Sequence, residues 1–91
     1  MSDARPVMLV TGASRGIGAA ISRQAAAAGY TVVVNYTAST EVAAALAEEI
    51  GNDSFAVQAD VGNEAAVLSM FATIDERVGH IDVLVNNANI A

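Results

Sequence analysis

Four short runs of apolar and β-branched residues recur along the chain, and stretches with helical periodicity fill the gaps between them. The apolar runs occupy residues 7–11, 31–35, 55–59 and 82–86. Continuous apolar strands of this kind are typical of a parallel sheet that helices cover on both faces. The alternation of the two patterns predicts an α/β fold with the order βαβαβαβ. With right-handed crossovers between the parallel strands, we predict half of a doubly wound parallel sheet with strand order 3-2-1-4.

The gaps between the runs carry apolar residues at the spacing of one helix face, and a glycine follows each stretch. The glycines at positions 29, 51 and 79 are candidates for helix C-terminal caps. The spacing predicts three buried faces, which consist of Ile17, Ile21, Ala25 and Ala28, then Val42, Leu46 and Ile50, then Val67, Phe71, Ile74 and Val78. Leu68 and Met70 lie partly off the third face.

The composition indicates one small folded domain that has more apolar surface than so short a chain can bury. The 91 residues are 54% hydrophobic, and the mean hydropathy is +0.44. A domain of this length buries only about 60–65% of the surface of its unfolded chain. The last strand is followed only by residues 87–91, so no later strand pairs with its outer edge. Because an open apolar edge favours association, we expect self-association through the edge of the fourth strand.

Charge and cysteine content narrow the classes of partner. The net charge is −6 at pH 7, and the basic residues are Arg5, Arg15, Arg23 and Arg77. A nucleic-acid-binding surface needs clustered basic residues, so we expect no nucleic-acid partner. The lack of cysteine excludes disulfides, and a single histidine, His80, argues against a transition-metal site.

No targeting or membrane-spanning signal is evident. Residues 1–6 lack the basic character of a secretory leader, and no apolar run approaches the roughly 18 residues that a membrane span needs. We therefore expect a cytoplasmic protein without a membrane partner.

A glycine-rich turn follows the first apolar run and leads into the first helix. It reads Thr11-Gly12-Ala13-Ser14-Arg15-Gly16-Ile17-Gly18, with the spacing G-x-x-x-G-x-G. In such a turn the backbone can approach phosphates closely, and the helix N-terminus directs free N–H groups at them. The same glycines would also fit a tight turn with close helix–sheet packing, but their place between strand and helix favours a nucleotide diphosphate site. A P-loop is excluded, since the chain has no lysine.

Two further motifs follow later strands, Asp60-Val61 after the third and Asn86-Asn87-Ala88 after the fourth. Together with residues 11–18 they make the chain resemble the short-chain dehydrogenase/reductase family. Among its members it is most similar to the 3-oxoacyl-acyl-carrier-protein reductases. The resemblance covers the whole chain but only the N-terminal part of a family member. It implies that residues 1–91 form a Rossmann-type, dinucleotide-binding half-domain without the catalytic C-terminal part.

The resemblance also implies roles for the motif residues. Asp60 would accept a hydrogen bond from the adenine amino group, with the backbone of Val61 beside it. Asn86 and Ala88 would line the cofactor near its ribose, while Asn87 would brace the sheet. The alternatives are that Asp60 only ends a strand and that Asn86 only satisfies a turn. The residues around the pyrophosphate and the adenosine ribose would be Gly12, Ser14, Arg15, Gly16, Ile17 and Gly18.

The segment after the second strand favours NADP(H) over NAD(H). An acidic residue about 20 positions after the glycines would bind the ribose and repel a 2′-phosphate. Here the segment reads Val34-Asn35-Tyr36-Thr37-Ala38-Ser39-Thr40 and has no carboxylate. Arg15, Ser39 or Thr40 can donate hydrogen bonds to a phosphate, and the candidate site extends to Asn35, Tyr36 and Ser39. The alternative is that Arg15 is a solvated surface charge and that Ser39 or Thr40 only caps the next helix.

The reaction implied by the resemblance is hydride transfer between nicotinamide and a carbonyl or alcohol, such as reduction of a 3-oxoacyl group. It requires Tyr-x-x-x-Lys, but the chain has only Tyr30 and Tyr36 and no lysine, so we assign no catalytic residue. Asn89 also departs from the family, which has glycine there, although asparagine tolerates left-handed backbone. The predicted function is therefore the NADP(H)-binding portion of an oxidoreductase. The alternatives are a non-catalytic nucleotide-binding module and an interaction fragment.

Overall fold

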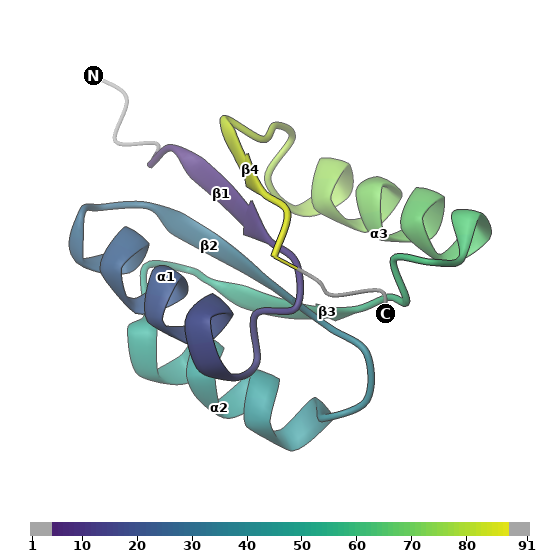
Figure 1. Ribbon diagram of the computed structural model, residues 1–91. Helices are drawn as coiled ribbons and strands as arrows, with labels where there is room; N and C mark the ends of the chain where they lie inside the picture. The colour runs from purple at the N-terminus through teal and green to yellow at the C-terminus, as the bar shows by residue number, and fades with distance from the viewer. Residues whose placement is uncertain (1–4, 88–91) are drawn as a thin grey trace.

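The computed structural model describes residues 5–87, which form a four-stranded parallel sheet covered by helices on both faces (Figure 1). The sheet order is β3-β2-β1-β4, which confirms the predicted fold class and strand order. The elements along the chain are β1 (Val7–Val10), α1 (Gly16–Ala27), β2 (Thr31–Tyr36), α2 (Thr40–Ile50), β3 (Phe55–Gln58), α3 (Glu64–Arg77) and β4 (Val83–Val85).

The strands begin at one edge of the sheet and end at the opposite edge. In the register of β1 with β2, Val7 pairs with Thr31 and Val10 with Val34. β4 pairs with the other side of β1, where Val10 lies opposite Val85. All pairs are parallel, so the segments that follow the four strands meet at the carboxyl edge, which is where α/β sheets bind ligands.

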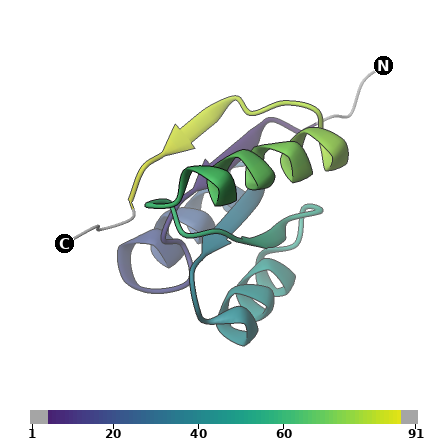
Figure 2. The same cartoon turned by 90° about the vertical axis from the view of Figure 1, so that its right-hand side faces the viewer.

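The helices divide the core into two layers. α1 and α2 cover one face of the sheet, and α3 covers the other, as the two perpendicular views show (Figures 1 and 2). Side chains of β2 alternate between these layers. Val32 and Val34 belong to the cluster beneath α1 and α2, whereas Val33 packs with Met70 and Ile74 of α3. β2 is buried along its whole length, as expected for a central parallel strand.

The predicted helix faces are wrong at four positions. Ile17 is 72% exposed, and Ala28, Val42 and Phe71 are also exposed. Met70, expected to lie partly off the face of its helix, is buried. The buried residues of the helices are Gly18, Ala19, Ser22 and Ala25 in α1, Ala43, Leu46 and Ala47 in α2, and Met70 and Ile74 in α3.

Small side chains explain the altered faces of α1 and α2. Glycine and alanine let a helix lie close to the sheet, so the side that carries them faces inward even where larger apolar residues stand beside it. Ser22 fits the same close contact because its hydroxyl donates to the carbonyl of Gly18 at 2.9 Å. Ile21 is left at the margin, where it packs only partly buried against the core.

The sheet ends at β4, and apolar side chains remain exposed near this edge. Leu84 of β4 is 56% exposed, and Phe71 of α3, which lines the same hollow as Leu84, is also exposed. Within residues 5–87, β4 pairs with β1 alone, so its outer edge is open there, as the sequence predicted. No helix in the described part of the chain is long and apolar enough to cross a membrane.

An exposed ion pair joins α1 to α2. The guanidinium of Arg23 donates to the carboxylate of Glu49 at 2.8 and 3.3 Å. This hydrogen bond, followed by the attraction of opposite charges, lowers the pKa of Glu49 and raises the pKa of Arg23. Both side chains are about half exposed, so solvent weakens the pair. The pair engages one of the four arginines, which lies in the same helix that the glycine-rich turn leads into.

Candidate functional site

The glycine-rich turn connects the carboxyl end of β1 to the start of α1. Gly12 and Gly16 have φ values of +60° and +57°, in the left-handed region that favours glycine. Arg15 is the N-cap residue of α1, and its side chain forms no cap hydrogen bond. The first N–H groups of a helix have no partner within it. The turn therefore directs uncapped amides to the carboxyl edge of the sheet.

Gly18 lies against the turn with no room for a side chain. A Cβ atom there would overlap the carbonyl oxygen of Gly12 and would lie 2.7 Å from Nδ2 of Asn87 and 2.8 Å from Cα of Ala13. Two of these three neighbours are backbone atoms, which cannot swing away. The third glycine of the motif is thus required by contact between helix and turn.

Asn35 lies beneath the turn, not on its open side. The residue is 1% exposed. Its Oδ1 accepts a hydrogen bond from the N–H of Gly12 at 3.3 Å, and its Nδ2 donates to the carbonyl of Ala59 at 3.1 Å. Tyr36 is buried as well and packs in the layer of α1 and α2. The structure therefore places these two candidate residues in the core around the site.

Asn87 supports the turn from the other side. Its Nδ2 donates to the carbonyl of Gly12 at 3.1 Å, and its N–H donates to Oγ1 of Thr11 at 2.9 Å. These bonds confirm the predicted bracing role. The hydroxyl of Thr11 also donates to Oδ1 of Asn86 at 3.2 Å. Ala88 and Asn89 lie outside the described residues.

The segment after β3 forms a tight turn that begins at Asp60. Oδ1 of Asp60 accepts from the N–H of Gly62 at 2.8 Å, and its carbonyl accepts from Asn63 at 2.9 Å. The carboxylate is exposed. Val61 and Asn86 line one hollow of about 210 Å³ next to the end of β1. The fold thus brings together the two motifs that follow β3 and β4.

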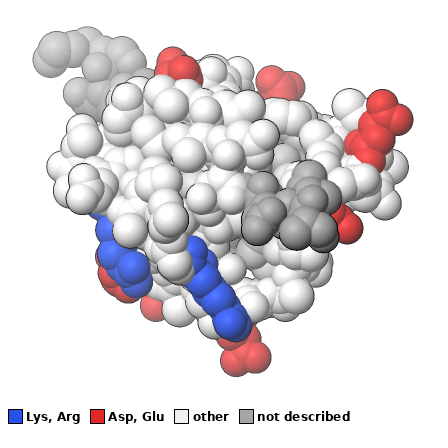
Figure 3. Space-filling view, in the orientation of Figure 1, with Lys and Arg blue, Asp and Glu red and all other residues white. Residues whose placement is uncertain are grey.

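Arg15 reaches the loop that precedes α2. Its Nη2 donates to Oγ of Ser39 at 3.1 Å. Ser39 is the N-cap residue of α2, yet its side chain forms no cap hydrogen bond. The alternative that the Ser39 side chain only caps α2 is therefore wrong. Both residues line a hollow of about 460 Å³, together with Ala38, Thr40, Glu41 and Val42. In Figure 3 the positive side chains visible on this side of the molecule lie near α1 and α2, while much of the remaining face is uncharged.

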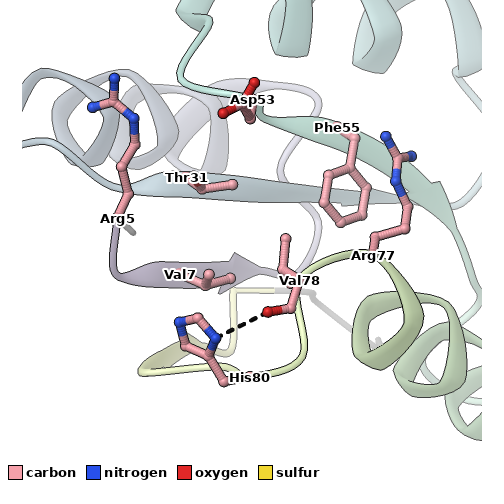
Figure 4. A pocket seen from close by; sticks show the side chains of 8 residues that line it. All are labelled: Arg5, Val7, Thr31, Asp53, Phe55, Arg77, Val78 and His80. Atoms are coloured by element: carbon pink, nitrogen blue, oxygen red, sulfur yellow. Dashed lines mark hydrogen bonds between the residues drawn. The ribbon is translucent and has the colours of Figure 1, made fainter. Parts of the chain in front are cut away.

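A further pocket lies at the opposite end of the strands, where they begin. It has a volume of about 320 Å³ and holds charged groups that do not converge (Figure 4). Arg77 stacks its guanidinium 3.9 Å from the ring centre of Phe55, and Arg5 lies on the other side of the pocket. Nδ1 of His80 is hydrogen-bonded to the carbonyl of Val78 at 3.0 Å. Within residues 5–87, no group of three or more His, Cys, Asp and Glu side chains is placed to hold a metal ion.

Sequence patterns alone did not reveal the contacts of two residues. Thr11 orders both asparagines that follow β4, and Glu41 lines the same hollow as Arg15. Thr11 could have been suspected from its place directly after a strand end. Glu41 carried no signal, because an acidic residue in the first turn of a helix has an ordinary explanation in the helix dipole.

The parallel sheet and the turn at its carboxyl edge define a Rossmann-type α/β protein. A family model described as short chain dehydrogenase matches residues 6–91. The chain belongs to the short-chain dehydrogenase family, whose matched relatives are oxidoreductases.

Curated relatives share about half of their residues with this chain over the matched segment. The 3-oxoacyl-[acyl-carrier-protein] reductase FabG of Staphylococcus aureus (strain Mu50) is 53% identical over 85 residues, which cover 90% of this chain and 35% of the relative. The 1-cyclohexenylcarbonyl-CoA reductase of Streptomyces collinus is 44% identical over 90 residues, which cover 96% of this chain and 32% of the relative. The chain therefore spans about a third of the length of the curated relatives it matches.

Solved structures of reductases share the fold. Menthone neomenthol reductase from Mentha piperita superposes with a TM-score of 0.82 at 33% identity, over 94% of this chain and 32% of that one. The angucycline C-6 ketoreductase LanV, solved with bound NADP, gives the same TM-score at 39% identity, over 93% of this chain and 37% of the LanV chain.

Proposed function

We propose that this chain binds NADP(H) as the dinucleotide-binding portion of a short-chain reductase. The observation that carries the proposal is the pairing of Arg15 with Ser39 beside two uncapped helix N-termini. A guanidinium, a hydroxyl and free backbone amides together form a favourable environment for phosphate groups. The NADP bound in LanV, a relative of the same fold, supports this assignment.

The proposed roles follow the order of the strands. The turn would bind the pyrophosphate through the backbone of Ser14, Gly16 and Ile17, while Gly12 and Gly18 shape the turn around it. After β3, Asp60 and Val61 receive the adenine ring. After β4, Asn86 would line the ribose next to the nicotinamide, and the same role for Ala88 stays a prediction from the sequence. Each role assigns a segment that the parallel sheet brings to its carboxyl edge.

The preference for NADP(H) rests on the hollow between the turn and α2. Arg15 would pair with a 2′-phosphate, and Ser39 would donate a hydrogen bond to it. The hydroxyl of Ser39 is turned toward Arg15 instead of capping α2. The N–H of Thr40 donates to the carbonyl of Ala38 at 3.1 Å, so the amides of Glu41 and Val42 are the ones proposed to face the same anion. Glu41 lines the hollow too, and its charge weakens the preference without abolishing it.

The bound cofactor would supply a hydride, and the residues described above would hold and orient it. Tyr-x-x-x-Lys does not occur in these 91 residues, so the role proposed for this chain is binding. Reduction of a 3-oxoacyl group by a longer protein that contains this segment is part of the proposal, supported by the 53% identity to the Staphylococcus aureus reductase. A cytoplasmic location remains a prediction from the sequence.

Titration with the two cofactors tests this function. We expect NADPH to bind saturably, with a dissociation constant about tenfold or more below that of NADH, because only NADPH carries the 2′-phosphate that Arg15 can pair with. Cofactor fluorescence measures the affinity, and a rise in melting temperature with NADPH concentration provides an independent readout. No saturable binding at millimolar NADPH would exclude the proposed function.

We also propose that copies of the chain associate through β4, whose outer edge is open within residues 5–87 and lies next to the exposed side chains of Phe71 and Leu84. Sedimentation velocity should show dimers or larger species at micromolar concentration. Leu84→Lys should shift the population toward monomer, since a charge on an edge strand opposes pairing. Val42→Lys is the matched control, an exposed apolar residue on α2. A monomer at all concentrations would contradict association.

A further inference from the structure

We infer that Asn35 is a positioning residue, which fixes the glycine-rich turn and the segment at Asp60 relative to each other. The inference deepens the proposed function and rests on it, because the two segments are the proposed binding sites of the pyrophosphate and the adenine. Asn35 itself is 1% exposed and acts through the backbone that it holds.

The amide of Asn35 joins three parts of the fold. On one side, Oδ1 accepts from the N–H of Gly12 at 3.3 Å. On the other side, Nδ2 lies within 3.1 Å of the carbonyl of Ala59 and 3.3 Å of the carbonyl of Val57. It also lies 3.4 Å from the sulfur of Met70. A single side chain thus connects the turn after β1, the end of β3 and a residue of α3.

The backbone of Asn35 reinforces the same link. Its carbonyl accepts from the N–H of Ala13 at 2.8 Å, so Asn35 occupies two successive amides of the turn. The amides of Gly12 and Ala13 therefore point into the protein. The amides that follow, up to the first turn of α1, are left to face a ligand. This division of donors is what gives the turn its orientation.

Asparagine suits this position better than any near-isostere. The carbonyl groups of Ala59 and Val57 require a donor, whereas the N–H of Gly12 requires an acceptor. An amide supplies both at one site. Aspartate would place a charge against two carbonyl oxygens in a buried site, and leucine would leave all three backbone groups without this partner.

The contacts on β3 extend the effect to the adenine site. Ala59 immediately precedes Asp60, and its N–H donates to the carbonyl of Tyr36 at 2.9 Å. Its carbonyl is held by Asn35. The backbone entering the Asp60 turn is therefore fixed on both sides of Ala59, and loss of the amide should release it together with Gly12.

A comparison of Asn35→Ala with Val33→Ala tests the inference. Val33 lies on the same strand, faces the same layer as Asn35 and is fully buried, so its truncation destabilises β2 without touching the turn. We expect amide hydrogen exchange at Gly12 and Ala13 to be about tenfold or more faster in Asn35→Ala than in Val33→Ala. The two variants are compared under conditions in which their global free energies of unfolding are equal. We expect the dissociation constant for NADPH to rise about tenfold, whereas Val33→Ala should stay within about twofold of the unchanged protein.

The outcomes separate positioning from simple structural support. Equal exchange at Gly12 and Ala13 in the two variants would overturn the inference. If Asn35→Ala fails to fold, Asn35→Ser gives the same comparison, and failure of both while Val33→Ala folds would show that Asn35 serves stability instead. If the unchanged protein does not bind NADPH, the proposed function fails, but the exchange measurements still decide the role of Asn35.

Discussion

We expect Gly18→Ala to lower the free energy of unfolding by about 3 kcal/mol and to abolish binding of NADPH at concentrations that saturate the unchanged protein. The added methyl group would overlap the carbonyl oxygen of Gly12 and lie 2.8 Å from Cα of Ala13. Neither backbone atom can yield without displacing the turn. Thermal denaturation followed by circular dichroism should show a melting temperature about 15 °C lower.

Gly16→Ala is the control for Gly18→Ala. A Cβ atom at Gly16 meets nothing within 4 Å, but the residue has φ +57°. This variant therefore measures backbone strain alone, which costs about 1–2 kcal/mol. If Gly18→Ala lowers the free energy of unfolding no more than Gly16→Ala does, then close contact between α1 and the turn is not what requires glycine at position 18.

The second large effect is expected for Arg15→Gln. Loss of a charge-assisted hydrogen bond to a 2′-phosphate removes about 1.5–3 kcal/mol of binding free energy, so the dissociation constant for NADPH should rise about 10- to 100-fold. The constant for NADH should change little, because NADH has no group at that position. Parallel fluorescence titrations with the two cofactors measure both values.

Arg77→Gln makes the same change in net charge at the other edge of the sheet, where Arg77 stacks on Phe55. Its effect on the affinity for NADPH should be slight, which separates a local contact from the general repulsion between an anionic cofactor and a more negative protein. If Arg15→Gln weakens NADH as much as NADPH, Arg15 does not bind the 2′-phosphate.

The order of the elements could be predicted because it depends on patterns that extend over many residues. Four apolar runs with helical stretches between them permit few topologies, and the glycine-rich turn fixed the first strand-to-helix connection. The boundaries agree to within one or two residues, as for β4, predicted at 82–86 and observed at Val83–Val85.

The rotation of the helices could not be predicted from apolar spacing. At Ile17 the large side chain is exposed while Gly18 and Ala19 face the core. Which side of a helix faces inward depends on how closely it approaches the sheet, and this distance depends on residues from other elements. Phe71 differs for a related reason, since it lies beside β4, where no further element within residues 5–87 covers it.

The sequence placed Asn35 in the candidate site because it lies at the end of β2, but the partners of its amide could not be predicted. They lie at positions 12, 57 and 59, far along the chain. A polar residue in a strand that is otherwise buried signals a hydrogen-bonding partner. The partner itself belongs to tertiary structure.

The support of Gly12 by Asn87 has a consequence for folding. Donor and acceptor are separated by 75 positions, and β4 follows β1, β2 and β3 in the chain. Contacts between such distant segments form late, because the intervening chain must first be ordered. The turn therefore acquires its final shape only when β4 docks beside β1. A nucleotide that binds this turn would serve as a reporter of a completed sheet during refolding.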